Sequence, residues 1–82
     1  MATFQIDKAY ISSIQQLIAE EDTRRLKLKL RNLHYADIAE IISEIEVEEA
    51  TYLVKLLDSE TTAEALAEVD VDIREGIFEN LS

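Results

Sequence analysis

The chain has 82 residues and a formal net charge of −10, so it can form one short domain, residues 1–82, that buries about 60% of its unfolded surface. It has no cysteine and no segment near the roughly 20 apolar residues that span a bilayer, which excludes disulfides, thiolate metal sites and membrane insertion by this segment. The N-terminus lacks the pattern of a secretory signal, and we expect a cytoplasmic protein.

The first 32 residues fit the same kind of scheme as the repeat described below, less regularly, and predict two helices. An apolar stripe runs along the first: Ile6, Tyr10, Ile14, Leu17 and Ile18. Asp22 or Thr23 can cap the second, whose leucines should point inward: Leu26, Leu30 and Leu33. Residues 25–31 alternate basic residues with leucine, a spacing typical of a strand. We still predict a helix, because no second strand is available to pair with it.

An internal repeat of twelve residues follows. Aliphatic residues mark its start: Leu33, Ile45, Leu57, Val69 and Leu81. Pairs of mostly apolar residues come eight and nine positions later: Ile41 and Ile42, Leu53 and Val54, Ala65 and Leu66, Ile77 and Phe78. Each pair precedes the next mark by four and three residues, so we expect pair and mark to share one helix face.

Polar residues follow the first four marks directly: His34, Glu46, Asp58 and Asp70. Carboxylates then cluster where the first helical turn is expected: Asp37, Glu48, Glu49, Glu60 and Asp72. Such residues can bond free backbone N–H groups and interact with the positive end of the helix dipole. Each unit therefore predicts a turn, a cap and a helix of eight or nine residues.

Helices this short are unstable alone in water and need their neighbours. We predict an all-α fold, a right-handed superhelical stack of short antiparallel helices in which each repeat mainly contacts the next.

Charge is unevenly distributed along the chain. Residues 1–34 have a net charge of +2, whereas residues 35–82 hold fourteen acidic and two basic side chains, a net charge of −12. The acidic part should repel nucleic acid and anionic membranes and attract cations or basic surfaces. The alternative interpretation, which charge alone favours, is that these residues serve only solubility.

Residues 33–40, Leu-His-Tyr-Ala-Asp-Ile-Ala-Glu, resemble the Leu-His-Pro-Ala-Asp-Ile-Ala-Glu pattern of the N-terminal cytosolic domain of MgtE-type magnesium transporters. Residues 19–24, 56–60 and 62–66 are similar to further elements of that domain. The family has proline at the first helical position, where this chain has Tyr35, Val47, Ser59 and Val71; proline there is favourable but optional. Flagellar motor switch proteins carry a related His-Pro-x-x-Ile-Ala element and short helical repeats, and they are the alternative resemblance.

The transporter resemblance implies a fragment that lacks the CBS domains and transmembrane helices of the full-length protein, which is a membrane homodimer. In that family, Mg²⁺ bridges acidic residues between this domain and the CBS domains of the same polypeptide and holds the pore closed. It implies a magnesium-sensing regulatory domain on the cytosolic face of the inner membrane. The alternative function is a helical-repeat scaffold that binds a protein partner.

Glu64 is the one metal ligand that the resemblance transfers by position, since it matches the acidic residue of the family at the CBS contact. Glu68 lies one helical turn later and can assist. The bland interpretation is that both are ordinary solvated carboxylates. The Mg²⁺ site would be weak and shared with domains outside this chain, as suits a hard cation that keeps several waters.

The other candidate groups of residues do not predict a functional site. Asp70 and Asp72 begin like a calcium loop, but Gly76 lies one place late and Leu81 occupies the position of the bidentate glutamate. His34 with Asp37 is more typical of a turn than of a metal pair, and the basic run at 24–31 more typical of a solvated face. With one histidine and no cysteine, nucleophilic catalysis lacks material, and we predict no enzymatic activity.

Overall fold

The computed structural model describes residues 5–81, and all regular structure in that range is α-helical. The helices are α1 (Lys8–Ala19), α2 (Thr23–Leu30), α3 (Tyr35–Glu44), α4 (Val47–Leu56), α5 (Ser59–Ala67) and α6 (Val71–Leu81). The predicted all-α class is therefore confirmed. The four helices from α3 onward begin twelve residues apart, as the repeat predicts.

Residues at the turns explain why the helices begin there. The Nδ1 atom of His34 accepts a hydrogen bond from the backbone N–H of Ala36 at 3.1 Å, at the start of α3. The Glu49 carboxylate accepts from the backbone N–H of Glu46, the N-cap of α4, at 2.9 Å. Asp58 accepts from the backbone N–H of Thr61 at 2.7 Å and so caps α5. Three of the four polar residues that follow the repeat marks are therefore N-caps, as predicted.

Helix α2 confirms that residues 25–31 are not a strand. Leu26 and Leu30, four residues apart, are buried with 0% and 2% of their surface exposed, whereas Leu28 is 52% exposed. A strand would place all three leucines on one face, while a helix separates Leu28 from the other two. The packing of α2 against the core therefore overrides the strand-like alternation of residues 25–31.

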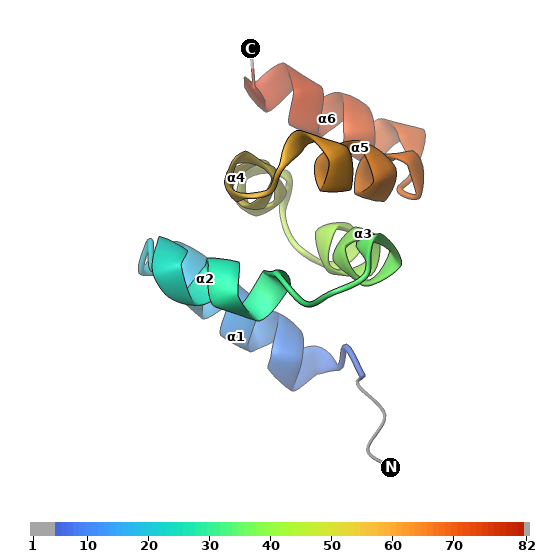
Figure 1. The fold of residues 1–82 in the computed structure, drawn as a ribbon. Helices are drawn as coiled ribbons and strands as arrows, with labels where there is room; N and C mark the ends of the chain where they lie inside the picture. The colour runs from blue at the N-terminus through green and yellow to red at the C-terminus, as the bar shows by residue number, and fades with distance from the viewer. Residues whose placement is uncertain (1–4, 82) are drawn as a thin grey trace.

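The six helices form three successive pairs, α1–α2, α3–α4 and α5–α6, arranged from the N-terminal to the C-terminal end of the molecule (Figure 1). Outside the α1–α2 pair, the closest packing joins α3 to α5, α4 to α6 and α1 to α4. We predicted that each repeat mainly contacts the next one. Instead, the strongest contacts in the repeat skip one helix, because consecutive helices share a layer and rest on the layer that follows. The handedness of the stack and the antiparallel arrangement stay predictions.

Two apolar cores lie between the three layers. The lower core joins α1 and α2 to the middle layer and consists of Ile14, Leu26, Leu30, Ile41 and Leu53. The upper core joins the middle layer to α5 and α6 and consists of Ile38, Ala39, Ile42, Ala50, Val54, Ala65, Leu66, Val69 and Ile77.

The adjacent residues Ile41 and Ile42 divide between these cores, as do Leu53 and Val54. We expected each pair to share one helix face. Adjacent residues on a helix point about 100° apart, which is enough for the middle layer to serve one core on each side. In the last layer, Ile77 is buried but Phe78 is 51% exposed.

Glu21, between α1 and α2, has a φ of +54°, in the left-handed region. Its N–H donates to the carbonyl of Ile18, and the N–H of Asp22 donates to the carbonyl of Leu17, both at 3.0 Å. This is the Schellman pattern, in which glycine is the favoured residue because it lacks Cβ.

Replacement of Glu21 by glycine should therefore stabilise the protein, raising the free energy of unfolding by up to about 1 kcal/mol. Urea denaturation followed by circular dichroism measures the change. Glu20→Gly is the matched control, since it also removes one carboxylate but at a residue with a φ of −83°; it should lower stability. A gain of similar size in both variants would contradict the backbone explanation.

Asp58 predicts a dependence of stability on pH. Hydrogen bonds from the backbone N–H and the hydroxyl of Thr61 lower the pKa of Asp58 below its ordinary value of 3.8. Because the pKa is lower in the folded state, the cap stabilises fully above the unfolded pKa and loses effect as pH falls through the folded pKa. Asp58→Ala should thus lower the urea midpoint most at neutral pH and less below about pH 4.

Asp58→Asn is the control, because asparagine caps helices well and does not titrate. The gap between the asparagine and alanine variants should stay constant with pH. A gap between wild type and Asp58→Ala that is equally large at acid and neutral pH would contradict the role of the charged cap.

Candidate functional site

Helix α5 presents the two predicted ligands, Glu64 and Glu68, to solvent. The helix buries Ala65 and Leu66 against the upper core, with 0% and 4% of their surface exposed. Glu64 and Glu68 are exposed, and Glu68 is the C-cap residue of the helix. Neither carboxylate has a hydrogen bond or ion pair within residues 5–81. Both are therefore accessible to a ligand from outside the chain.

The carboxylates do not form a closed metal centre. Residues 5–81 contain no group of three or more histidine or acidic side chains placed to hold a metal ion together. Carboxylate oxygens nevertheless match the preference of Mg²⁺, which is held in many proteins by one or two carboxylates and retained water. The donor set at α5 therefore fits a hydrated Mg²⁺ ion whose remaining ligands come from water or from a second surface.

The surroundings of α5 are acidic. Exposed carboxylates of α5, α6 and the turn between them are Glu60, Asp70, Asp72, Glu75 and Glu79. The basic residue of this part of the chain, Arg74, donates to the backbone carbonyl of Leu66 at 3.4 Å and forms no ion pair in the described part of the chain. This layer therefore carries a negative field that favours cations or a basic surface.

The structure also tests two other candidate metal sites, the pair His34–Asp37 and a calcium loop at Asp70. His34 is held in a turn by its hydrogen bond to Ala36, with its ring 4.1 Å from the ring of Tyr35. The predicted structural role of His34 is therefore confirmed. Residues 71–81 form α6 rather than a loop, so no calcium loop starts at Asp70.

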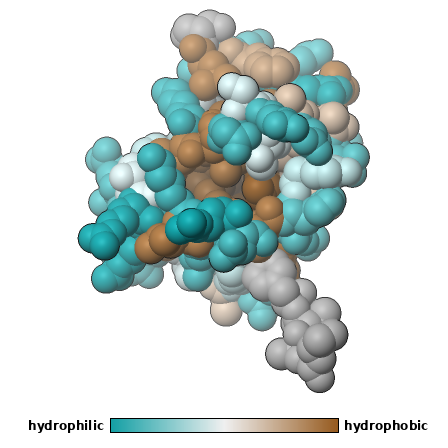
Figure 2. All heavy atoms as spheres, viewed as in Figure 1, coloured by the Kyte–Doolittle hydropathy of each residue, from teal (hydrophilic) through white to brown (hydrophobic). Residues whose placement is uncertain are grey.

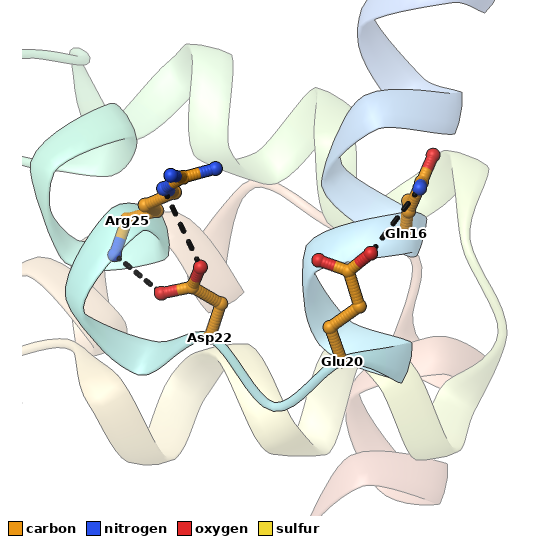
Figure 3. Close-up of polar contacts among 4 residues, drawn as sticks. All are labelled: Gln16, Glu20, Asp22 and Arg25. Atoms are coloured by element: carbon orange, nitrogen blue, oxygen red, sulfur yellow. Dashed lines mark hydrogen bonds and ion pairs between the residues drawn. The ribbon is translucent and has the colours of Figure 1, made fainter.

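The basic residues of α2 point in different directions, which sequence reasoning did not foresee. The Arg25 side chain folds back on Asp22, with Nε 3.5 Å from the carboxylate, next to the Gln16–Glu20 hydrogen bond (Figure 3). Lys29 places Nζ 4.9 Å from the centroid of the Tyr10 ring of α1.

Burial, with a smaller contribution from the negative charge of Asp37, raises the pKa of Tyr10. Tyr10 therefore stays a neutral phenol beside Lys29 at physiological pH. Two cations of α2 are thus engaged with α1 or with the turn that precedes α2, whereas Arg24 and Lys27 form no ion pair within residues 5–81.

No helix within residues 5–81 has both the length and the apolar character that crossing a membrane requires.

Comparison with known proteins identifies a family over the part of the chain that carries the twelve-residue repeat. A model of the MgtE intracellular N domain family matches residues 33–82, which contain all four helices of the twelve-residue repeat. No curated protein and no solved structure matches the chain significantly. The match covers more than half of the sequence, and it favours the transporter resemblance over the flagellar one. The chain belongs to the MgtE intracellular N domain family, whose members are cytosolic domains of magnesium transporters.

Proposed function

We propose that this chain is a magnesium-sensing regulatory domain, which docks on the CBS domains of a homodimeric magnesium transporter through shared Mg²⁺ ions. The observation that carries the proposal is the pair of exposed, unpaired carboxylates Glu64 and Glu68 on the most acidic layer of a chain of this family.

In this proposal, charge repulsion and Mg²⁺ binding switch the domain between an undocked and a docked arrangement. Residues 35–82 have a net charge of −12, so an acidic partner surface is repelled unless counter-ions screen the contact. Bound Mg²⁺ supplies positive charge between the two surfaces. Glu64 provides an oxygen ligand from α5, and Glu68 assists from one turn later. If ions bind only in the docked arrangement, their concentration sets the docked population by mass action.

The weakness of the half-site within this chain suits a sensor. A closed cage of carboxylates would saturate at low concentration, whereas a site divided between two surfaces forms only when they meet. Two carboxylates, one on α5 and one at its C-cap, leave most coordination positions to water and to the partner, which matches the reluctant dehydration of Mg²⁺. In this proposal the domain catalyses no reaction, and it regulates the transporter by docking on or separating from the CBS domains.

The direct test compares salts in a full-length transporter that contains this domain. MgCl₂ should protect the boundary between the domain and the CBS domains against limited proteolysis more than NaCl of equal ionic strength. Glu64→Gln should shift the protective Mg²⁺ concentration upward, because it removes one charged ligand. Glu20→Gln is the matched control, since it removes one charge in the α1–α2 turn, and it should leave the protection unchanged.

Equal protection by the two salts would contradict the sensing proposal, as would equal shifts in the two variants. The isolated 82 residues should gain little thermal stability from Mg²⁺ beyond its ionic strength, because half of each shared site is missing.

A further inference from the structure

A groove with a leucine floor lies between α2 and the α4–α5 turn. Its volume is about 610 Å³, and its apolar lining is Leu28, Leu30, Leu33, Leu56 and Leu57. Figure 2 shows apolar surface at the centre of this face, bordered by strongly hydrophilic side chains over α2. We name it the α2 groove.

Three cations border the α2 groove: Arg24, Lys27 and Arg31. With Leu28 they have the spacing i, i+3, i+4 and i+7, which places them on one side of α2 and its C-cap. All three are exposed, and none forms an ion pair within residues 5–81. This side of α2 therefore offers three available positive charges around one exposed leucine.

The acidic residue of the groove, Asp58, carries one negative charge against three positive ones. Asp58 lines the groove, but its carboxylate accepts hydrogen bonds from the backbone N–H and the hydroxyl of Thr61 at 2.7 and 3.1 Å. Asp58 is thus engaged in capping α5. The groove keeps a positive rim in a chain whose overall charge is −10.

We propose that the α2 groove binds an acidic amphipathic helix of a partner protein. Charge complementarity selects the polar face of that helix, because carboxylates spaced by one and two turns match cations that extend over about 10 Å of α2. The leucine floor selects its apolar face, which is the helix-in-groove mode of recognition.

An anionic bilayer fits the groove less well. A bilayer contact needs apolar side chains that protrude beyond the cations. Here Leu30 is buried, Leu33, Leu56 and Leu57 are half-buried in the floor, and Leu28 alone among the lining leucines is mostly exposed. The acidic layers also repel anionic surfaces. The recessed leucines therefore favour a ligand that inserts one apolar face into the groove, as a helix does, over a flat bilayer.

The test is binding of a fluorescent peptide to the whole 82-residue chain, measured by anisotropy. The probe has about 16 residues, long enough for partial helicity, with leucine along one face and glutamate elsewhere; a lysine-for-glutamate version is the reverse-charge probe. We expect saturable binding of the acidic probe, weakened by added salt, and no binding of the lysine probe.

Matched double variants locate the site. Lys27→Gln with Arg31→Gln should weaken binding about tenfold, from the loss of two charge pairs. Lys8→Gln with Lys55→Gln removes the same charge from exposed residues of α1 and α4 that do not line the groove, and it should leave the affinity unchanged. Leu28→Ala should weaken binding and change the unfolding midpoint only slightly, since about half of the Leu28 surface is exposed.

Four outcomes would overturn the proposal: no saturable binding, equal loss in the two double variants, binding of the chain to phosphatidylserine vesicles through the same cations without peptide binding, or concentration-dependent self-association that blocks the peptide. Peptide binding requires no Mg²⁺, so its failure leaves the sensing proposal intact, and the reverse also holds.

Discussion

The middle pair of helices, α3–α4, is buried from both sides, and the remaining helices depend on that burial. Helices of eight to twelve residues are marginal on their own in water, so none of these elements is stable without neighbours. Ile41 and Leu53 complete the lower core, while Ile42 and Val54 enter the upper one. The half-buried repeat marks Leu33, Ile45 and Leu57 pack against both cores. The middle layer therefore connects the two ends of the domain through continuous apolar contact.

This architecture explains how a small domain can present two surfaces of opposite charge. Apolar residues at fixed positions in each repeat face the cores, which leaves the other positions free to carry charge. On α5 and its C-cap those positions hold Glu64 and Glu68, and on α2 and its C-cap they hold Arg24, Lys27 and Arg31. The charges need no partners inside the chain, because the stack is held by its cores. In the described residues, Arg25 with Asp22 forms the single salt bridge, and an exposed pair of this kind contributes little stability.

Most of the fold follows from the sequence. The twelve-residue spacing predicts where α3, α4, α5 and α6 begin, because caps and acidic first turns are local signals that need no tertiary context. The division of Ile41 and Ile42 between two cores was not predicted. Periodicity identifies the buried side of a helix, but it does not say how many neighbouring layers that side meets.

The candidate site is predictable to a smaller degree. The exposure of Glu64 and Glu68 is expected for carboxylates, which are almost never fully buried without a partner. Their role as ligands depends on a surface outside this chain, and no pattern within it specifies that surface. The α2 groove was missed for another reason. Its floor includes Leu56 and Leu57, which lie about 30 residues from α2 in sequence and reach it only through the stacking of layers.

Hydrogen exchange on the variant Ile41→Val tests the central role of the middle layer most directly, because Ile41 belongs to the lower core alone. Loss of one methylene should lower the free energy of opening by about 0.5–1.5 kcal/mol. If α3–α4 joins both cores into one cooperative unit, the slowest amides of α5 and α6 should lose as much protection as those of α1 and α2. A loss confined to α1 and α2 would show that the layers unfold independently and would contradict the account.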